Sequence, residues 1–154
     1  MPTQGTVPVP FAQATDEAEP IVTPSGRVTV RILATGAQTG GVMGLMENVY
    51  LPGNGFPMHV HNKEDETLYV LEGTVLWVGG DLRTEAGPGT LIYGPRGIPH
   101  GFVAIGDVPL KFIEWFNPAG LEELFNAPEE LARYIAAGRT SERYDLQVVG
   151  PLPE

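Results

Sequence analysis

The chain has 154 residues, which is enough for one domain with a sizeable hydrophobic core. It contains no cysteine, so disulfide frameworks, thiolate metal sites and cysteine nucleophiles are excluded. The formal net charge is −10, with only nine lysines and arginines together, so no basic patch for nucleic acid is expected.

Residues 1–26 are expected to form an extended N-terminal arm, because they hold five prolines and few large apolar side chains. The sequence leaves open whether this arm is disordered or lies along a sheet edge, including the edge of a partner subunit. The arm has no continuous apolar run, so we expect no signal peptide, and no segment of the chain approaches the length of a membrane span. The expected location is the cytoplasm, without membrane contact.

Residues 27–117 consist of short β-rich runs punctuated by glycine, proline and aspartate. Turn signals at Glu72-Gly73, Gly79-Gly80 and Gly106-Asp107 separate several of these runs. Many short strands at close spacing predict an all-β sandwich or barrel. The expected strands are Arg27–Ala34, Val42–Leu51, Glu66–Leu71, Thr74–Val78, Leu82–Ala86, Thr90–Tyr93, Gly101–Ile105 and Val108–Phe116.

The pattern changes to helical spacing in residues 118–138, where we expect two short C-terminal helices, Leu121–Phe125 and Pro128–Ala137. Pro128 suits the first turn of the second helix, and Gly138 is its expected stop. Residues 139–154 form a tail, in which 146–149 is a candidate for a docked strand.

The protein has three histidines, His59, His61 and His100. Two of them are spaced i, i+2, so on a strand both rings point to the same face. Glu66 follows at the start of the next apolar run, and His100 comes after a turn-rich segment. If these imidazoles and this carboxylate converge inside a barrel, they form a site for a divalent transition metal.

Two stretches around these residues resemble the paired motifs of the cupin superfamily. The first has Gly53, five residues, His59-Val60-His61, four residues, Glu66, six residues and Gly73. The second has Gly89, five residues, Pro95-Arg96-Gly97, two residues and His100. Two positions depart from the second motif, because Thr90 stands where the family has aspartate and Ala104 where it has asparagine.

The resemblance implies a single cupin jelly-roll barrel over about 27–117, with His59, His61, Glu66 and His100 as metal ligands. Three neutral nitrogens and one carboxylate leave two positions of an octahedron open for a chelating substrate, or for a substrate and dioxygen together. The ligand types suit one divalent transition metal, such as iron, manganese, nickel, cobalt or zinc, and do not choose among them. In flavonol-cleaving cupins the matching glutamate is thought to accept a substrate proton, which gives Glu66 a catalytic role as well.

Period-two alternation places Leu68, Val70 and Phe102 on the same inward face as the ligands, which predicts a largely apolar pocket. Four further side chains are candidates for the pocket mouth, although plain packing explains each of them as well. They are Met46, Tyr93, Phe112 and Trp115. Such a pocket favours a small aromatic or hydrophobic organic substrate.

The segment from Asn117 to Phe125 is similar to the tails of small bacterial cupins grouped with quercetin dioxygenases. Its helices either close the barrel mouth as a lid or pack on the outer sheet. The leading expectation is therefore a metal-dependent dioxygenase that cleaves a flavonol-like or other chelating enol. The alternative is a non-redox cupin enzyme, namely a polyketide cyclase, an isomerase or a lyase. A sensor or storage protein ranks last. Cupins often pair, so we also expect a homodimer.

Overall fold

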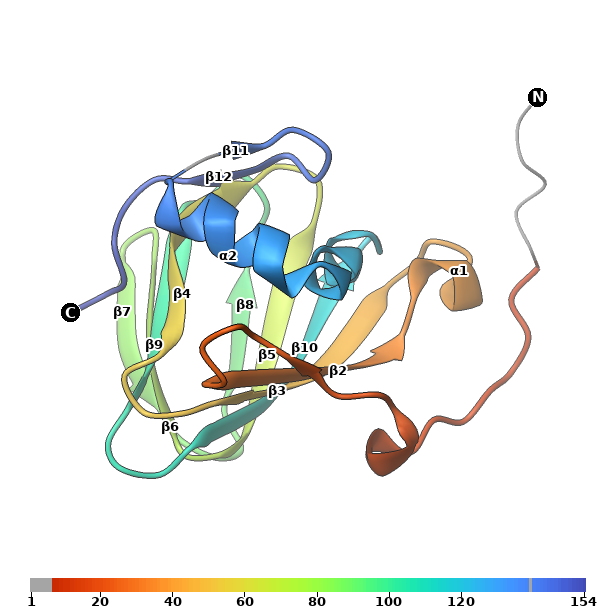
Figure 1. The fold of residues 1–154 in the computed structure, drawn as a ribbon, viewed down its shortest axis with the longest axis horizontal. Helices are drawn as coiled ribbons and strands as arrows, with labels where there is room; N and C mark the ends of the chain where they lie inside the picture. The colour runs from red at the N-terminus through yellow and green to blue at the C-terminus, as the bar shows by residue number, and fades with distance from the viewer. Residues whose placement is uncertain (1–6, 139) are drawn as a thin grey trace.

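The computed structural model describes residues 7–138 and 140–154, which form two antiparallel six-stranded sheets. In spatial order, the first sheet holds β1 (Ile21–Val22), β2 (Val28–Ala34), β3 (Gly44–Tyr50), β10 (Leu110–Asn117), β5 (Asp65–Glu72) and β8 (Leu91–Gly94). The second sheet holds β11 (Thr140–Ser141), β12 (Leu146–Val148), β4 (Gly55–His61), β9 (His100–Ile105), β6 (Thr74–Gly79) and β7 (Leu82–Ala86). The sheets face each other as a jelly roll (Figure 1), which confirms the predicted all-β class.

The core lies between the sheets and is filled by one face of each strand. Along β3 and β10, buried side chains alternate strictly with more exposed ones, as expected for strands with one buried face. Phe102 of β9 packs edge-on against Tyr50 of β3 and Phe112 of β10, with ring centroids 5.2 and 5.4 Å apart. These contacts join the two sheets at the centre of the domain.

Each of the eight strand runs expected from the sequence corresponds to an observed strand, with ends that differ by at most two residues. β4 was not among those runs, because Gly55 and Pro57 interrupt its pattern. The structure explains Gly55, since a Cβ there would lie 1.9 Å from the carbonyl oxygen of Phe102. A short helix α1 (Gly36–Thr39), capped by Thr35, was also not expected.

The C-terminal segment begins with a 3-10 helix, η2 (Leu121–Asn126), followed by α2 (Pro128–Ala136). The helical spacing of the first part is thus realised as a 3-10 helix. Ala127 separates the two helices with φ −125° and ψ 67°, because a residue before proline is disfavoured in the α conformation. Gly138 adopts φ +59° just after α2, in agreement with the expected stop.

A buried carboxylate anchors η2 to the body of the domain. Glu122 is fully buried and accepts hydrogen bonds from the backbone N–H groups of Gly36 at 2.9 Å and Gly120 at 2.7 Å. Gly44 leaves room for this carboxylate, since a Cβ there would lie 2.1 Å from Glu122 Oε2. The position of η2 therefore depends on one side chain and on a glycine opposite to it.

Both ends of the described chain add strands to the sheets from outside 27–117. Ile21 and Val22 pair with β2 of the same chain, so this part of the N-terminal arm lies along a sheet edge, preceded by a 3-10 turn, η1 (Thr15–Glu17). Residues 1–6 of the expected arm lie outside the described residues. β12 of the tail pairs with β4 directly beside His59 and His61. Among the described residues, no helix is long and apolar enough to cross a membrane.

Candidate metal centre

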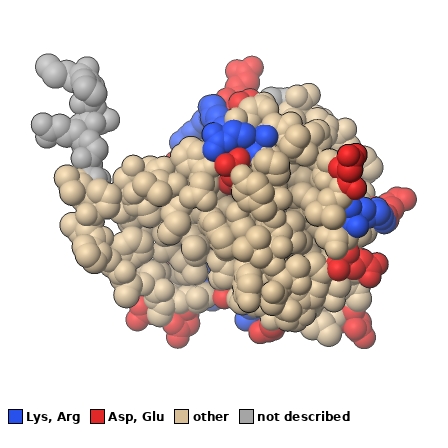
Figure 2. Space-filling model, turned by 180° about the vertical axis from the view of Figure 1, so that it is seen from behind, with Lys and Arg blue, Asp and Glu red and all other residues tan. Residues whose placement is uncertain are grey.

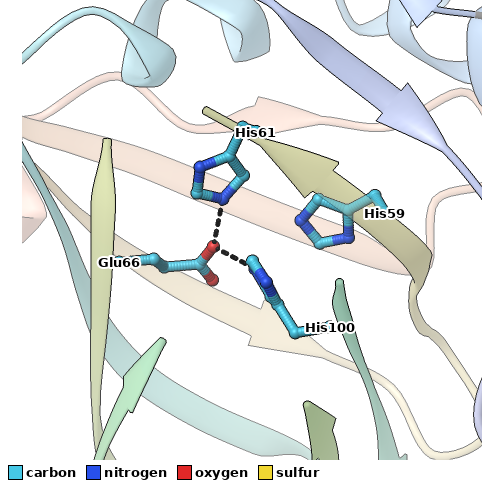
Figure 3. Close-up of side chains that lie close together, drawn as sticks. All are labelled: His59, His61, Glu66 and His100. Atoms are coloured by element: carbon cyan, nitrogen blue, oxygen red, sulfur yellow. Dashed lines mark hydrogen bonds and ion pairs between the residues drawn. The ribbon is translucent and has the colours of Figure 1, made fainter. Parts of the chain in front are cut away.

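The four ligand candidates converge between the two sheets (Figure 3). His59 and His61 come from β4, His100 from the adjacent β9, and Glu66 from β5 in the facing sheet. All four side chains are buried, and one ligand atom from each lies within 4.8 Å of the others. The i, i+2 spacing of the first two histidines therefore does place both rings on the inner face.

Each histidine ring is oriented by a backbone carbonyl oxygen close by in the chain. The Nδ1 atoms lie next to these oxygens: His59 to Pro57 at 2.8 Å, His61 to Glu64 at 3.0 Å and His100 to Ile98 at 2.8 Å. A carbonyl oxygen only accepts, so each Nδ1 carries the proton and donates it. In the neutral rings, each Nε2 then keeps a lone pair for another partner.

The donor set at the centre is electron-rich. Nε2 of His61 lies 3.0 Å, and Nε2 of His100 2.8 Å, from Oε2 of Glu66. Nitrogen lone pairs and a carboxylate oxygen facing one another repel unless a proton or a shared cation lies between them. The arrangement thus fits a divalent cation held by three imidazoles and one carboxylate.

The charges in the cluster also favour a bound cation. Burial, and next the charge of His100, lower the pKa of His59 to about 3. Burial also opposes charge on His100, but the charge of Glu66 and its hydrogen bond outweigh it and raise the His100 pKa. For Glu66, burial is likewise outweighed by His100 and His61, and the pKa lies well below its usual range. Glu66 is therefore ionised, and its negative charge attracts positive charge to this point.

A second buried carboxyl group lies beside the ligands and was not foreseen. Glu114 of β10 shares a hydrogen bond with Glu66 and accepts another from Asn48 Nδ2 at 3.0 Å. Burial, and next the charge of Glu66, raise the pKa of Glu114 well above its usual range, so Glu114 is protonated and donates to Glu66. Its sequence signal is a carboxyl group within the alternating apolar positions Leu110, Phe112 and Phe116.

Aromatic side chains fix the ring planes of His59 and His100. Phe56 packs against the ring of His59, with centroids 4.5 Å apart. Trp77 stacks on His100 at 5.8 Å, with an angle of 18° between the planes. The histidines are therefore held by packing as well as by hydrogen bonds.

A small cavity of about 20 Å³ adjoins the cluster. Its polar wall is formed by His59, Glu66 and Glu114, and its remaining wall is apolar. Three of the apolar residues belong to η2, so η2 covers the cavity as a lid instead of packing on the outer face of a sheet. The apolar lining consists of Tyr50, Phe56, Phe102, Phe116, Leu121, Leu124, Phe125 and Leu146.

The residues expected to form the pocket lie in different places. Phe102 lines the cavity. Met46, Leu68, Val70 and Phe112 are fully buried in the core and do not line it.

Tyr93 and Trp115 occupy the strand positions that alternate with the inward ones, and Tyr93 is 53% exposed. The structure does not bring these two residues to the site, because side chains at their positions point away from the histidines. The structure thereby corrects their expected place at the pocket mouth.

Comparison with known proteins identifies a matching domain that contains the four ligand candidates. A family model described as a cupin domain matches residues 47–116, which include all four ligand candidates. An uncharacterised protein of Methanocaldococcus jannaschii is 31% identical over 98 residues, which cover 64% of this chain and 78% of that protein.

Two solved structures illustrate the similarity in fold. KdgF from Halomonas sp. has a TM-score of 0.63 at 20% identity, over 73% of this chain and 98% of that one. The polyketide cyclase RemF from Streptomyces resistomycificus has a TM-score of 0.60 at 29% identity, over 71% of this chain and 80% of that one.

Proposed function

Because this chain belongs to the cupin superfamily, we propose that it is a metal-dependent enzyme acting on a small organic molecule. His59, His61, Glu66 and His100 are the proposed ligands of one divalent transition metal. The observation that carries the proposal is the orientation of the three imidazoles, whose Nδ1 atoms face backbone carbonyl oxygens while Nε2 of His61 and His100 faces Glu66.

The chain's own residues supply such a site with a proton acceptor and with a group that positions it. When bound, the metal polarises a substrate oxygen and lowers the pKa of a proton on or next to it. Glu66 lines the cavity and is the proposed acceptor of that proton. Glu114 donates a hydrogen bond to Glu66 and thereby holds its carboxylate in place. The apolar side chains of η2 exclude water from the reacting groups.

The proposed reaction is dioxygenation of a flavonol-like or other chelating aromatic or enol substrate. The mostly apolar wall of the cavity suits a largely apolar substrate that presents its chelating oxygens to the ligands. The test is oxygen uptake with a flavonol, using protein loaded separately with iron, manganese, cobalt, nickel and zinc. We expect uptake with at least one metal and none with the same metal in His61→Ala. Absence of uptake with every metal refutes dioxygenation.

A second candidate, non-redox cyclisation, isomerisation or lyase chemistry, is favoured by the 29% identity to a polyketide cyclase. The same ligand set serves this chemistry, because polarisation of a carbonyl needs no change of oxidation state. A product that has the elemental composition of the substrate or has lost only water distinguishes this candidate from the first. So does cleavage of the substrate into fragments without oxygen uptake. Mass spectrometry of the reaction mixture provides that measurement.

We also propose that the protein is a homodimer. The outer face of the first sheet exposes Tyr69 and Leu71 of β5 and Leu91 and Tyr93 of β8, which are 38–56% exposed. Figure 2 shows a broad uncharged area on one side of the molecule, with charged side chains around it. Sedimentation velocity of the full chain and of a variant lacking residues 1–26 tests the proposal, and a monomer in both cases contradicts it.

A further inference from the structure

An apolar groove lies outside the metal cavity and shares part of its wall. The groove runs between α2 and the start of the first sheet, and Figure 1 shows α2 beside the hairpin of β1 and β2. Its floor includes Val28 and its helical wall Leu131 and Ile135. Tyr50, Phe56 and Phe125 line both the groove and the cavity at the cluster. Among the described residues, these three aromatic side chains alone are common to both spaces.

The cavity at the cluster and the groove differ in size, so they suit different parts of one substrate. The cavity at the cluster measures about 20 Å³, and about 10–15 Å³ is enough for one water molecule, so it admits one small polar group. The groove measures about 250 Å³. A cavity of about 150 Å³ holds a benzene ring, so the groove accepts a ring system larger than one ring. An organic substrate that reaches the ligands past this shared wall therefore places most of its volume in the groove.

The composition of the groove specifies the kind of molecule that fits. Its inner part is aromatic and aliphatic, with no charged side chain among its lining residues. Its outer rim carries the polar side chains of Thr23, Ser25 and Asn54, which can bond hydroxyl groups. Flat apolar rings gain from stacking and burial in such a groove, whereas a charged or sugar-like tail loses its hydration there.

We infer that this groove is the binding site for the ring system of the substrate. The substrate class is a planar, largely apolar molecule of two or three rings with an oxygen chelating group at one end. That end passes between Tyr50, Phe56 and Phe125 to reach the cluster. The inference deepens the proposed function and depends on it for the chelating end, while the groove itself requires only the apolar contacts.

Among the three shared aromatic residues, Phe125 is the one placed to move. Tyr50 is fixed by Phe102 and by Phe112, whose ring stacks on it at 5.7 Å, and Phe56 by the ring of His59. Phe125 belongs to the six-residue 3-10 helix η2, whose hydrogen-bond geometry is weaker than that of an α-helix. Selectivity for the shape of the ring system therefore resides in η2 and α2, which lie outside the residues matched by the family model.

The experiment fills the groove without touching the cluster. Ala132→Trp and Ala136→Trp each place an indole on the groove side of α2, and Ala136 is exposed, so at least that variant has no packing reason to misfold. Ala137→Trp is the matched control, because Ala137 is exposed and lines neither the groove nor the cavity. Cobalt-loaded proteins are dialysed against 3-hydroxyflavone, which has rings and a chelating end, and against acetohydroxamic acid, which has only the chelating end.

We expect both groove variants to bind 3-hydroxyflavone about tenfold or more weakly than the control, because the indole occupies the space of the rings. Acetohydroxamic acid binding and the visible cobalt spectrum should stay the same in all proteins. Equal affinity of the groove variants and the control for 3-hydroxyflavone overturns the inference.

Failure of the proposed function has a different signature, namely no bound cobalt and no acetohydroxamic acid binding. In that case metal-free protein is dialysed against flavone, which lacks the chelating hydroxyl. Weaker flavone binding in the groove variants than in Ala137→Trp still supports the groove, and equal binding refutes it.

Discussion

Replacement of Glu122 by alanine tests whether one carboxylate holds the lid over the metal cavity. The fully buried side chain accepts two backbone N–H groups, from Gly36 and Gly120. Alanine leaves both donors, which are partly buried, without this partner. Each unpaired donor costs about 1–3 kcal/mol, so we expect the free energy of unfolding to fall by about 4 kcal/mol. That is a large fraction of the roughly 5–15 kcal/mol available to a domain.

Two further variants distinguish the effect of the buried carboxylate from that of an exposed side chain of η2. Glu122→Gln keeps one acceptor oxygen and turns an amide N–H₂ group toward the other donor, so we expect a loss of about 2 kcal/mol. Glu123→Ala is the control, because Glu123 is exposed and only pairs with Arg143 at 3.8 Å. Its expected loss is below about 0.5 kcal/mol.

The assay is equilibrium urea unfolding followed by circular dichroism, together with limited proteolysis of the native proteins. We expect Glu122→Ala to be cleaved near η2 faster than the control, since η2 loses its attachment to α1. Cobalt affinity should change little, because all four ligands come from strands. A free energy of unfolding within about 1 kcal/mol of the unaltered protein would contradict the anchoring role.

Three other predictions concern the metal, the pH dependence and the core. Loss of a residue that hydrogen-bonds a metal ligand typically lowers metal affinity about 10–100-fold. His61→Ala removes a ligand itself, so it should lower cobalt affinity by more than this, while circular dichroism shows an unchanged fold. Asp65, hydrogen-bonded by Arg96, has a pKa lowered to about 2, so its contribution to stability is complete above about pH 4 and is lost as the pH falls through 2. Asp65→Asn should remove this loss of stability at acid pH. We expect the loss to be below about 1 kcal/mol, because the pair is partly exposed. A stability–pH curve that is the same with and without the substitution argues against this contribution of Asp65. Phe112→Ala should destabilise the fold by about 3–5 kcal/mol in urea unfolding, because Phe112 is fully buried. Leu82→Ala, at an exposed position of the second sheet, should stay within about 0.5 kcal/mol, and comparable losses in the two variants would count against the assigned core.

The sequence by itself determined the features that depend on spacing along the chain. Short β-rich runs bounded by turn residues located eight strands, and the i, i+2 spacing put His59 and His61 on one face. The glycines, prolines and ligands of the two motifs marked the family and the four residues that converge. These features were predictable because a strand has a fixed period of two, and because turns need particular residue types.

Only the tertiary structure decided what surrounds those ligands. Alternation cannot tell a pocket wall from a packed core, so it predicted a place in the pocket for Leu68 and Val70, which are buried in the core and do not line the cavity. Glu114 became a partner of Glu66 because β10 lies between β3 and β5 in the sheet, an order that no local pattern encodes. Likewise, Phe125 reaches the cavity only because Glu122 holds η2 over it. Neighbours across a sheet are set by contacts between residues far apart in sequence, whereas the local period fixes only the face on which each side chain lies.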